Sequence, residues 1–536
     1  MNMKYKLLLF IFLSFPSLQG MAQNMNWSTV NSGGKTIDIY SNRKISIDPL
    51  GNKYVTAHFK DSMTVENTTV HSAREGVCLL VYNSQDSLIR AKTLWECEKG
   101  VSQYTIWSQA LDNASNLIFC INFEDSILVN NMMYHSKGSY DMLFLKTDSL
   151  GNQIYCKHWG SPCIEQINLM SVTFDHDNNA IVTGGNGFPP IGFTDTCHLQ
   201  IDTLTLSTVN GKIFILKFDS LGNLIKSKTF GGTGSAGGAA IRFLNGRYYL
   251  FGGFSSQIGV LDNVTINFPS NLNYKNFIAQ LDEDFNAVWA RYFGTNNFPI
   301  LSRGFDVKCN QITLTGYSND ANGFLFQNGA TLIGNGNWDF FVAAYDSSGN
   351  YKWGKVSQSY SSEFITDLVV DQEMNSYITG SFQASLILDN DTLHSHGIED
   401  AFVLCLDSLG NEKWALNAGG NGVNSGNGIA IDGDSSVYVV GGTTSDPCYF
   451  GNSTHSANSL PAIFVAKIES TPLSNTEFVL QKKLTLYPNP NSGNFTLQCD
   501  AHTPQYITVY SMLGECVFSA TTNSHPTSIP IQLPPL

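Results

Sequence analysis

The sequence predicts an all-β protein: a seven-bladed β-propeller with four-stranded blades, followed by a small carboxy-terminal β-sandwich-like domain. First, a strand-turn-strand pattern recurs through most of the 536 residues. Second, charged residues make up only 14% of the chain and aromatic residues 12%, which is typical of β-rich proteins and not of coiled coils or disordered tails. Third, the two ends of the repeat array carry complementary half-units, as a closed ring requires.

The first half of each repeat is a pair of apolar strands joined by a polar turn. The clearest copy runs from Ile429–Asp432 to Val437–Gly441. The equivalent second strands recur every 61 to 68 residues, ending near Ala57, Cys120, Gly184, Gly252, Gly316, Gly380 and Gly441. Such regular spacing over seven copies indicates a repeat architecture, with each copy supplying one blade.

The second half of each repeat is an apolar strand closed by an Asp and a Gly-Asn turn. Ala401–Leu406 leads into the turn Asp407–Asn411, and the same turn recurs in other copies. Asp favours the start of a type I turn, and Gly accepts the left-handed position that reverses the chain. The turn residues are Asp148, Asp219, Asp346 and Asp407, with Gly151, Gly222, Gly349 and Gly410.

An aromatic position follows each of these turns in the better-preserved copies. It is occupied by Trp289, Trp353 and Trp414, with Tyr155 in another copy. In two other copies this position holds a basic residue instead, Arg90 or Lys226. We expect the aromatic side chains to play a structural part in the repeat.

The ends of the array predict how the ring closes. The strand around Trp27 has no partner before it, whereas Ala462–Ile468 ends the array without the strand that should follow. We therefore expect the amino-terminal strand to complete the last blade, which removes the exposed edges of an open array. A solenoid is the alternative architecture, but it gives no reason for complementary half-units.

The best-preserved copy resembles a known repeat family. Asp400–Val403, the turn Asp407–Asn411, Trp414, the pair Gly419-Gly420 and the strand pair that follows together resemble the bacterial SBBP β-propeller repeats. This resemblance covers most of the mature chain and implies a propeller fold and an extracellular location, but no reaction.

The amino terminus resembles a secretory signal peptide over residues 1–22. Lys4 and Lys6 precede the apolar stretch Leu7–Phe15, and we predict cleavage between Ala22 and Gln23. The apolar stretch is about half of the roughly 20 residues that a membrane-spanning helix needs. We therefore expect an exported chain without a transmembrane segment, with the propeller over residues 23–470.

The chain after the repeats contains a linker, 471–483, and a small β module, 484–536. The module closely resembles the type A sorting domain of the type IX secretion system. The residues that carry this resemblance are Tyr487, Pro488, Asn489, Pro490, Asn491, Gly493, Phe495 and Gly514. The resemblance implies passage through the periplasm, export by the type IX machinery, and release or attachment at the cell surface. Members continue beyond the strand at Ser528–Leu533, so we interpret the end at Leu536 as a truncation.

The charge and the cysteines exclude several kinds of partner and site. The net charge is -14 and the sequence holds no basic run, so nucleic acid is a poor candidate partner. The 11 cysteines cannot all pair, because their number is odd. We interpret most of them as buried free thiols. Two pairs, Cys156 with Cys163 and Cys499 with Cys516, could form disulfide bonds. We expect no cofactor.

Two groups of side chains invite a metal interpretation, and for both we favour a repeat-encoded turn. Asp175–Asn179, Asp371–Glu373 and Asp432–Asp434 lack the full set of calcium ligands, so calcium is only an alternative. His71, His135, His394 and His455 occupy the same position in four copies, so they should lie around the ring and not around one ion.

We expect a non-catalytic extracellular binding or adhesion scaffold whose ligand, a glycan or a protein, the sequence does not identify. No nucleophile elbow or carboxylate dyad can be assigned. The alternative is a glycan-active hydrolase or lyase with its site at the channel mouth, near the insertion Gly187–Thr205. A channel mouth lined by Asn, Ser and Gly alone would exclude that alternative.

Overall fold

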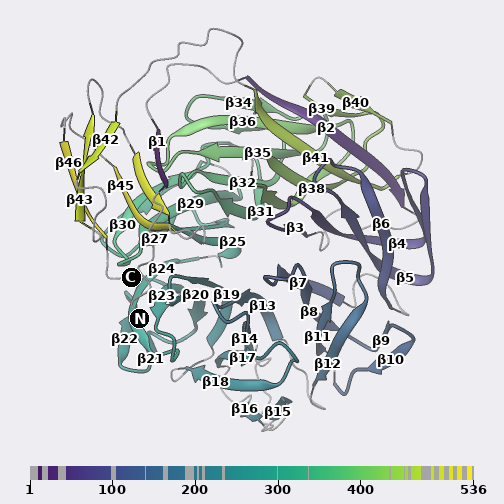
Figure 1. Ribbon diagram of the computed structural model, residues 1–536, viewed down its shortest axis with the longest axis horizontal. Helices are drawn as coiled ribbons and strands as arrows, with labels where there is room; N and C mark the ends of the chain where they lie inside the picture. The colour runs from purple at the N-terminus through teal and green to yellow at the C-terminus, as the bar shows by residue number, and fades with distance from the viewer. Residues whose placement is uncertain are drawn as a thin grey trace, which may run out of the picture.

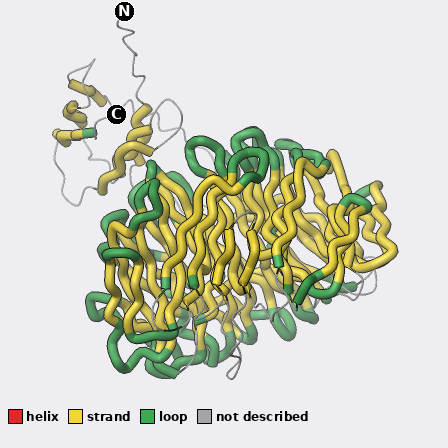
Figure 2. Tube along the Cα trace, turned by 90° about the horizontal axis from the view of Figure 1, so that it is seen from below, coloured by secondary structure: helices red, strands yellow, loops and turns green. Residues whose placement is uncertain are grey.

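The computed structural model describes residues 10–14, 22–33, 44–97, 104–138, 140–160, 167–186, 198–201, 204–207, 212–231, 234, 236–297, 300–335, 337–433, 436–451, 453–456, 460–471, 484–487, 494–499, 506–510, 516–521 and 528–533. Every regular element in these residues is a strand, as Figure 2 shows for the described part of the chain. The all-β prediction is therefore confirmed. No helix in the described ranges is long and apolar enough to cross a bilayer.

Seven four-stranded antiparallel sheets surround a central axis, so the predicted seven-bladed propeller is confirmed (Figure 1). The innermost strands, from blade 1 to blade 7, are β3 (Ile45–Ile47), β7 (Tyr104–Leu111), β13 (Ile167–Phe174), β19 (Ala236–Leu244), β25 (Leu301–Lys308), β31 (Glu363–Val370) and β37 (Asn424–Ile431). The second strands are β4 (Lys53–Val65), β8 (Leu117–Phe123), β14 (Ala180–Asn186), β20 (Arg247–Phe254), β26 (Gln311–Ser318), β32 (Ser376–Phe382) and β38 (Val437–Thr443).

The outer half of each blade follows the same order. The third strands are β5 (Thr68–Tyr82), β11 (Asp141–Thr147), β17 (Ile213–Phe218), β23 (Tyr274–Leu281), β29 (Asp339–Asp346), β35 (Asp400–Leu406) and β41 (Ala462–Thr471). The outer strands are β6 (Leu88–Cys97), β12 (Gln153–Trp159), β18 (Leu224–Phe230), β24 (Ala287–Thr295), β30 (Tyr351–Val356), β36 (Glu412–Gly420) and, in blade 7, β2 (Ala22–Gly33).

The amino-terminal strand β2 closes the ring, as the sequence predicts. It pairs antiparallel with β41 from Ala22 opposite Thr471 to Ser32 opposite Ala462. Its last residues also pair with β4 of blade 1. Blade 7 is therefore built from both ends of the array, and Figure 1 shows purple β2 beside β41.

Each blade also carries an outer hairpin that the four-strand repeat did not predict. These hairpins connect the second and third strands, and in blade 1 the hairpin is the extension of β4 and β5 themselves. The separate hairpins are β9–β10 (Ser126–Val129, Met132–His135), β15–β16 (His198–Ile201, Leu204–Ser207), β21–β22 (Ile258–Leu261, Val264–Asn267), β27–β28 (Phe324–Phe326, Thr331–Leu332), β33–β34 (Ser385–Ile387, Thr392–His394) and β39–β40 (Cys448–Phe450, Ser453–His455). Three of them, β9–β10, β27–β28 and β39–β40, pair with the outer strand of the preceding blade.

The hydrophobic core lies between the blades. All seven residues of β8 are buried, because both faces of its sheet are covered by neighbouring blades. One cluster joins Tyr438 and Val440 of blade 7 to Val55 and Leu80 of blade 1. Packing on both faces explains why these strands are apolar throughout and why so few charged residues are needed.

The carboxy-terminal module consists of two small sheets. One contains β42 (Leu484–Tyr487), β43 (Asn494–Cys499) and β46 (Ser528–Gln532), and the other contains β44 (Tyr506–Tyr510) and β45 (Cys516–Thr521). Strand β1 (Phe10–Ser14), from the apolar part of the predicted signal peptide, pairs with the edge of β44. The linker residues 472–483 lie outside the described part of the chain.

Candidate functional site

The innermost strands are joined to one another by polar side chains around the channel. The Oδ2 atom of Asp306 in blade 5 accepts a hydrogen bond from Val370 N in blade 6 at 2.9 Å. The Oδ2 atom of Asp367 in blade 6 accepts one from Ile429 N in blade 7 at 3.2 Å. Ser171 Oγ in blade 3 accepts from the blade 4 backbone in the same way. These bonds satisfy backbone groups that would otherwise face the channel unpaired.

Charged side chains gather at the same level of the channel. Arg242 of blade 4 lies 3.5 Å from Asp306 Oδ1 and donates to Ser171 Oγ at 3.2 Å. Burial raises the pKa of Asp367, whereas the positive charges of Lys44 and Arg242 oppose that rise. The innermost strands therefore carry two carboxylates, Asp306 and Asp367, and the cation Arg242, so their lining is not Asn, Ser and Gly alone.

Sequence reasoning missed this charged group, because the innermost strands differ most between repeats. Asp306 lies near the end of β25, whereas Asp367 lies in the middle of β31, so the two aspartates do not share one position of the repeat. Arg242 likewise has no basic residue at the equivalent position of the adjoining copies.

A second candidate surface lies on the face formed by the connections between blades, which we call the connection face. It comprises the segments that join second to third strands and outer to innermost strands. In blades 5 to 7 this face exposes a group of apolar and aromatic side chains, the exposed strip: Ile333 (56% exposed), Tyr360 (79%), Ile398 (64%) and Tyr449 (39%).

Contacts made by residues next to the exposed strip connect the segments that carry it. Ser361, next to Tyr360, donates to the carbonyl oxygens of Gln383 and Ser385 at the base of the β33–β34 hairpin. The other strand of this hairpin leads to His396, whose ring lies 5.6 Å from that of Tyr449. The strip therefore extends across two blade junctions.

A pocket lies at the outer side of blades 5 and 6, beneath the β33–β34 hairpin. It is an open hollow lined by Phe340, Val342, Leu404 and Leu406, among others, and its cavity volume of about 30 Å³ has room for about one water molecule. An ion pair between Lys355 and Asp389 lies at its rim.

The predicted turn residues lie on the opposite face, which we call the turn face. In each Asp turn, Oδ1 accepts from the backbone N–H groups two and four residues later, as Asp407 does from Leu409 and Asn411. The glycine takes φ values near +80°, as Gly410 does at +83°. The other turn aspartates Asp148, Asp219 and Asp346 make the same bonds.

In three repeats the aromatic position contacts the turn of the next blade. Trp289 Nε1 donates to Ser347 O at 3.2 Å, and Trp353 Nε1 donates to Ser408 O at 2.9 Å. Tyr155 lies against Gly222 in the same way. Trp414 instead packs near Tyr377 within its own blade. Trp27 lies in β2, where its side chain is outside the described residues.

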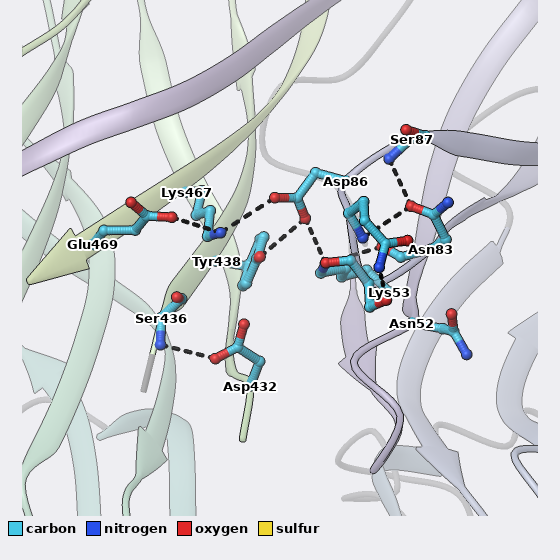
Figure 3. Close-up of polar contacts among 12 residues, drawn as sticks. Asn52, Lys53, Asn83, Asp86, Ser87, Asp432, Ser436, Tyr438, Lys467 and Glu469 are labelled. Carbon is cyan, nitrogen blue, oxygen red and sulfur yellow. Dashed lines mark hydrogen bonds and ion pairs between the residues drawn. The ribbon is translucent and has the colours of Figure 1, made fainter. Parts of the chain in front are cut away.

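A polar cluster on the turn face links blade 7 to blade 1, where the ring closes (Figure 3). Tyr438 Oη of blade 7 donates to Asp86 Oδ1 of blade 1 at 2.9 Å. Lys467 pairs with Asp86 Oδ2 at 3.3 Å, and Lys53 pairs with Asp86 Oδ1. The side chain of Lys53 is only 3% exposed, so Asp86 supplies the negative charge that a buried ammonium requires.

The four histidines at the shared repeat position lie in different blades. His71, His135, His394 and His455 lie in the outer hairpins of blades 1, 2, 6 and 7, in strands and not in the expected turn. Within the described ranges, no three His, Cys, Asp or Glu side chains come together as metal ligands. Asp175, Asp371 and Asp432 all lie at turns between first and second strands, with their Oδ1 atoms bound to backbone N–H groups.

Seven of the cysteines carry free thiols: Cys78, Cys97, Cys120, Cys156, Cys309, Cys405 and Cys448. The suggested bridge from Cys156 to Cys163 is therefore wrong. Cys156 is packed against the core cluster of blades 1 and 2, where burial raises its pKa to about 11. Cys163, most of the insertion 187–205 and the sorting residues Pro488–Gly493 and Gly514 lie outside the described residues. Tyr487 is exposed and Phe495 is buried in the module's core.

Comparison with known families identifies the carboxy-terminal module. Residues 485–534 match the family described as the secretion system C-terminal sorting domain. The module is a secretion sorting domain. Its presence directs this chain to the type IX secretion machinery and hence to the outer surface or the medium. The match does not extend to the propeller, so the SBBP repeat type stays a prediction.

Relatives of the propeller are distant. An uncharacterized WD repeat-containing protein of Acanthamoeba polyphaga mimivirus is 27% identical over 129 residues, which are 23% of this chain and 9% of that protein. The chain thus matches about a tenth of that relative's length.

Solved structures with similar folds are equally distant in sequence. The Dos1 propeller is 10% identical with a TM-score of 0.39, covering 80% of this chain and 94% of the other. The polysaccharide lyase Uly1 is 9% identical with a TM-score of 0.41, covering 82% and 92%. Similarities at this level give no information on activity.

Proposed function

We propose that the sorting-domain protein acts outside the cell as a non-catalytic binding or adhesion scaffold. The observation that carries this proposal is the exposed strip on the connection face, where Tyr360 and Ile398 are more than half exposed beside polar hairpin residues. Exposed aromatic side chains of this kind are common at sites that bind glycans or proteins. The closed ring provides the rigid support that such a surface needs.

The alternative is a glycan-active enzyme in the channel. The observation that favours it is the ion pair of Asp306 with Arg242, together with the positive charges of Lys44 and Arg242 that act on Asp367. Against it, each carboxylate already accepts hydrogen bonds from strand backbone groups, which is a structural use of both oxygens. A catalytic carboxylate needs an oxygen that can reach a substrate.

Binding by the mature chain to a glycan array and to candidate surface proteins tests the proposal. We expect saturable binding that Tyr360→Ala weakens at least tenfold and that Asp306→Asn leaves unchanged. Ile89→Ala is the matched control, because Ile89 is an exposed apolar side chain, 54% exposed, on a blade that lacks the strip. Turnover of a bound glycan that Asp306→Asn abolishes would support the enzyme instead.

A further inference from the structure

The connection between β34 and β35 carries a histidine that a buried aspartate holds in place. His396 Nδ1 lies 2.7 Å from Asp400 Oδ2, and the backbone N–H of His396 donates to the same oxygen at 2.9 Å. Asp400 is fully buried, whereas the His396 side chain is 47% exposed. Because a carboxylate only accepts hydrogen bonds, Nδ1 carries the proton of this bond. The pair therefore fixes the imidazole ring and leaves Nε2 as its second polar atom.

Blade 2 holds the equivalent aspartate in a different way. Asp141 begins β11 as Asp400 begins β35, and its Oδ2 pairs at 2.6 Å with Nε2 of His158, which is only 17% exposed. His158 belongs to the outer strand, and the strand registers place Asn417 at the same position in blade 6. Asn417 Nδ2 also reaches Asp400 Oδ2, at 3.4 Å. His396 is therefore a second side-chain donor to this oxygen, and it comes from the exposed connection.

The free side of the His396 ring belongs to the exposed strip. Its Nε2 has no hydrogen-bond partner in the described part of the chain. The ring lies 5.6 Å from that of Tyr449, which is 39% exposed, and Ile398 follows two residues later at 64% exposed. Tyr449 is fixed by the pairing of β39 with β36, where it lies opposite Gly419. An unused polar atom and an exposed aromatic ring are thus held side by side on rigid backbone.

This pair of groups matches the chemistry of an uncharged sugar. Nε2 accepts a hydrogen bond when the imidazole is neutral and donates one when it is charged, and a hydroxyl group can serve as its partner in either state. A sugar ring also presents a face of C–H groups, which can pack against an aromatic ring such as that of Tyr449. The net charge of -14 repels acidic polymers, so the charge of the chain favours an uncharged glycan.

We propose that His396 and Tyr449 form a sugar-binding subsite of the exposed strip, with Asp400 as the positioning residue that orients the imidazole. This inference rests on the proposed function and narrows its ligand to an uncharged glycan. One sugar ring packs against Tyr449, and one of its hydroxyl groups forms a hydrogen bond with His396 Nε2. A few oriented polar groups beside aromatic side chains are the usual composition of a site that selects its ligand.

Binding of the mature chain to immobilised laminarin, mannan, dextran and starch tests this subsite, with alginate as the acidic comparison. We expect saturable binding to at least one of the uncharged polysaccharides. His396→Asn should weaken it about tenfold, because the amide can still donate to Asp400 but has no counterpart of Nε2. His176→Asn is the matched control, because His176 is 54% exposed at a turn between first and second strands and should not contact the ligand.

Tyr449→Ala is the second variant if His396→Asn does not fold, as its melting temperature would show, and it should lose binding to a similar extent. Unchanged binding by whichever of the two variants folds overturns the subsite but leaves the scaffold proposal standing. A wild type that binds only alginate, or only a surface protein, overturns the subsite in the same way. A wild type that binds none of these ligands overturns both proposals.

Discussion

The indole of Trp353 in blade 5 lies directly against Gly410 in the turn of blade 6. A Cβ atom built at position 410 would lie 2.6 Å from the ring. The φ of Gly410 is +83°, and the same indole donates to Ser408 O in that turn. Two separate features therefore require Gly at this position: the backbone conformation and the neighbouring ring.

Gly410→Ala should destabilise the propeller by about 2 kcal/mol, because it adds both strain at positive φ and a clash with the indole. In a Trp353→Ala background the same change should cost only about 1 kcal/mol, the backbone part alone. Urea unfolding of the two single variants and the double variant measures the difference. Equal costs in both backgrounds would show that the ring contact has no energetic effect.

At the junction of blades 3 and 4, both residue types differ from this arrangement. Lys226 of blade 3 occupies the aromatic position, and Phe285 of blade 4 occupies the glycine position. The Lys226 ammonium lies 5.3 Å from the Phe285 ring, and Phe285 has a φ of +62°. Phe285→Gly alone should destabilise, because it removes a fully buried ring. Adding Lys226→Trp should restore part of the lost stability by recreating the standard pair. A double variant no more stable than Phe285→Gly would contradict this interpretation.

Asp86→Asn should weaken the closure of the ring. The change leaves the buried Lys53 without its counter-charge, at a cost of about 2 kcal/mol. Asp284→Asn is the matched control, because Asp284 also pairs with a lysine but its side chain is 77% exposed. The control should cost less than about 0.5 kcal/mol. Equal melting temperatures for the two variants would argue against a closing role for Asp86.

The aspartate turns should make the propeller sensitive to acid. Burial acts to raise the pKa of Asp148, but hydrogen bonds from Asn152 hold it below its usual value, and Asp219 and Asp282 behave alike. Because the pKa of these aspartates is lower in the folded state than the unfolded value near 4, their ionised side chains stabilise the folded state above that pH. This stabilisation is lost as the pH falls below it. The urea concentration at the midpoint of unfolding should therefore stay constant from pH 7 to 5 and should decrease when the pH is below 4. A midpoint unchanged down to pH 3 would exclude this effect.

The sequence predicts the ring well because the repeat encodes it locally. The Asp and Gly of each turn and the apolar strands identify the blades, and the strand at Trp27 indicates the closure. The outer hairpins escape prediction because their strands can be as short as the two residues Thr331–Leu332, and because three of them pair with a strand of another blade. Strands this short leave no periodicity in the sequence.

The candidate sites are harder to predict because they depend on contacts between blades. Asp306 reaches a backbone group 64 residues away, and nothing in its local sequence indicates that partner. Glu363 takes the position that Asn424 takes in the next copy, which shows only in their shared hydrogen bonds to the residue before the third strand of the preceding blade. Repeats obscure such exceptions, since neighbouring copies look alike.

Closure of the ring by β2 is the claim on which the whole account depends, and a disulfide cross-link tests it directly. Asn24 lies opposite Glu469 in the β2–β41 pairing. Cross-strand neighbours have Cβ atoms about 5 Å apart, close enough for a disulfide. The variant Asn24→Cys with Glu469→Cys should oxidise to a single intramolecular bridge and unfold at a higher temperature than its reduced form. If the bridge does not form in the folded protein, or forms only between molecules, then β2 does not close the ring.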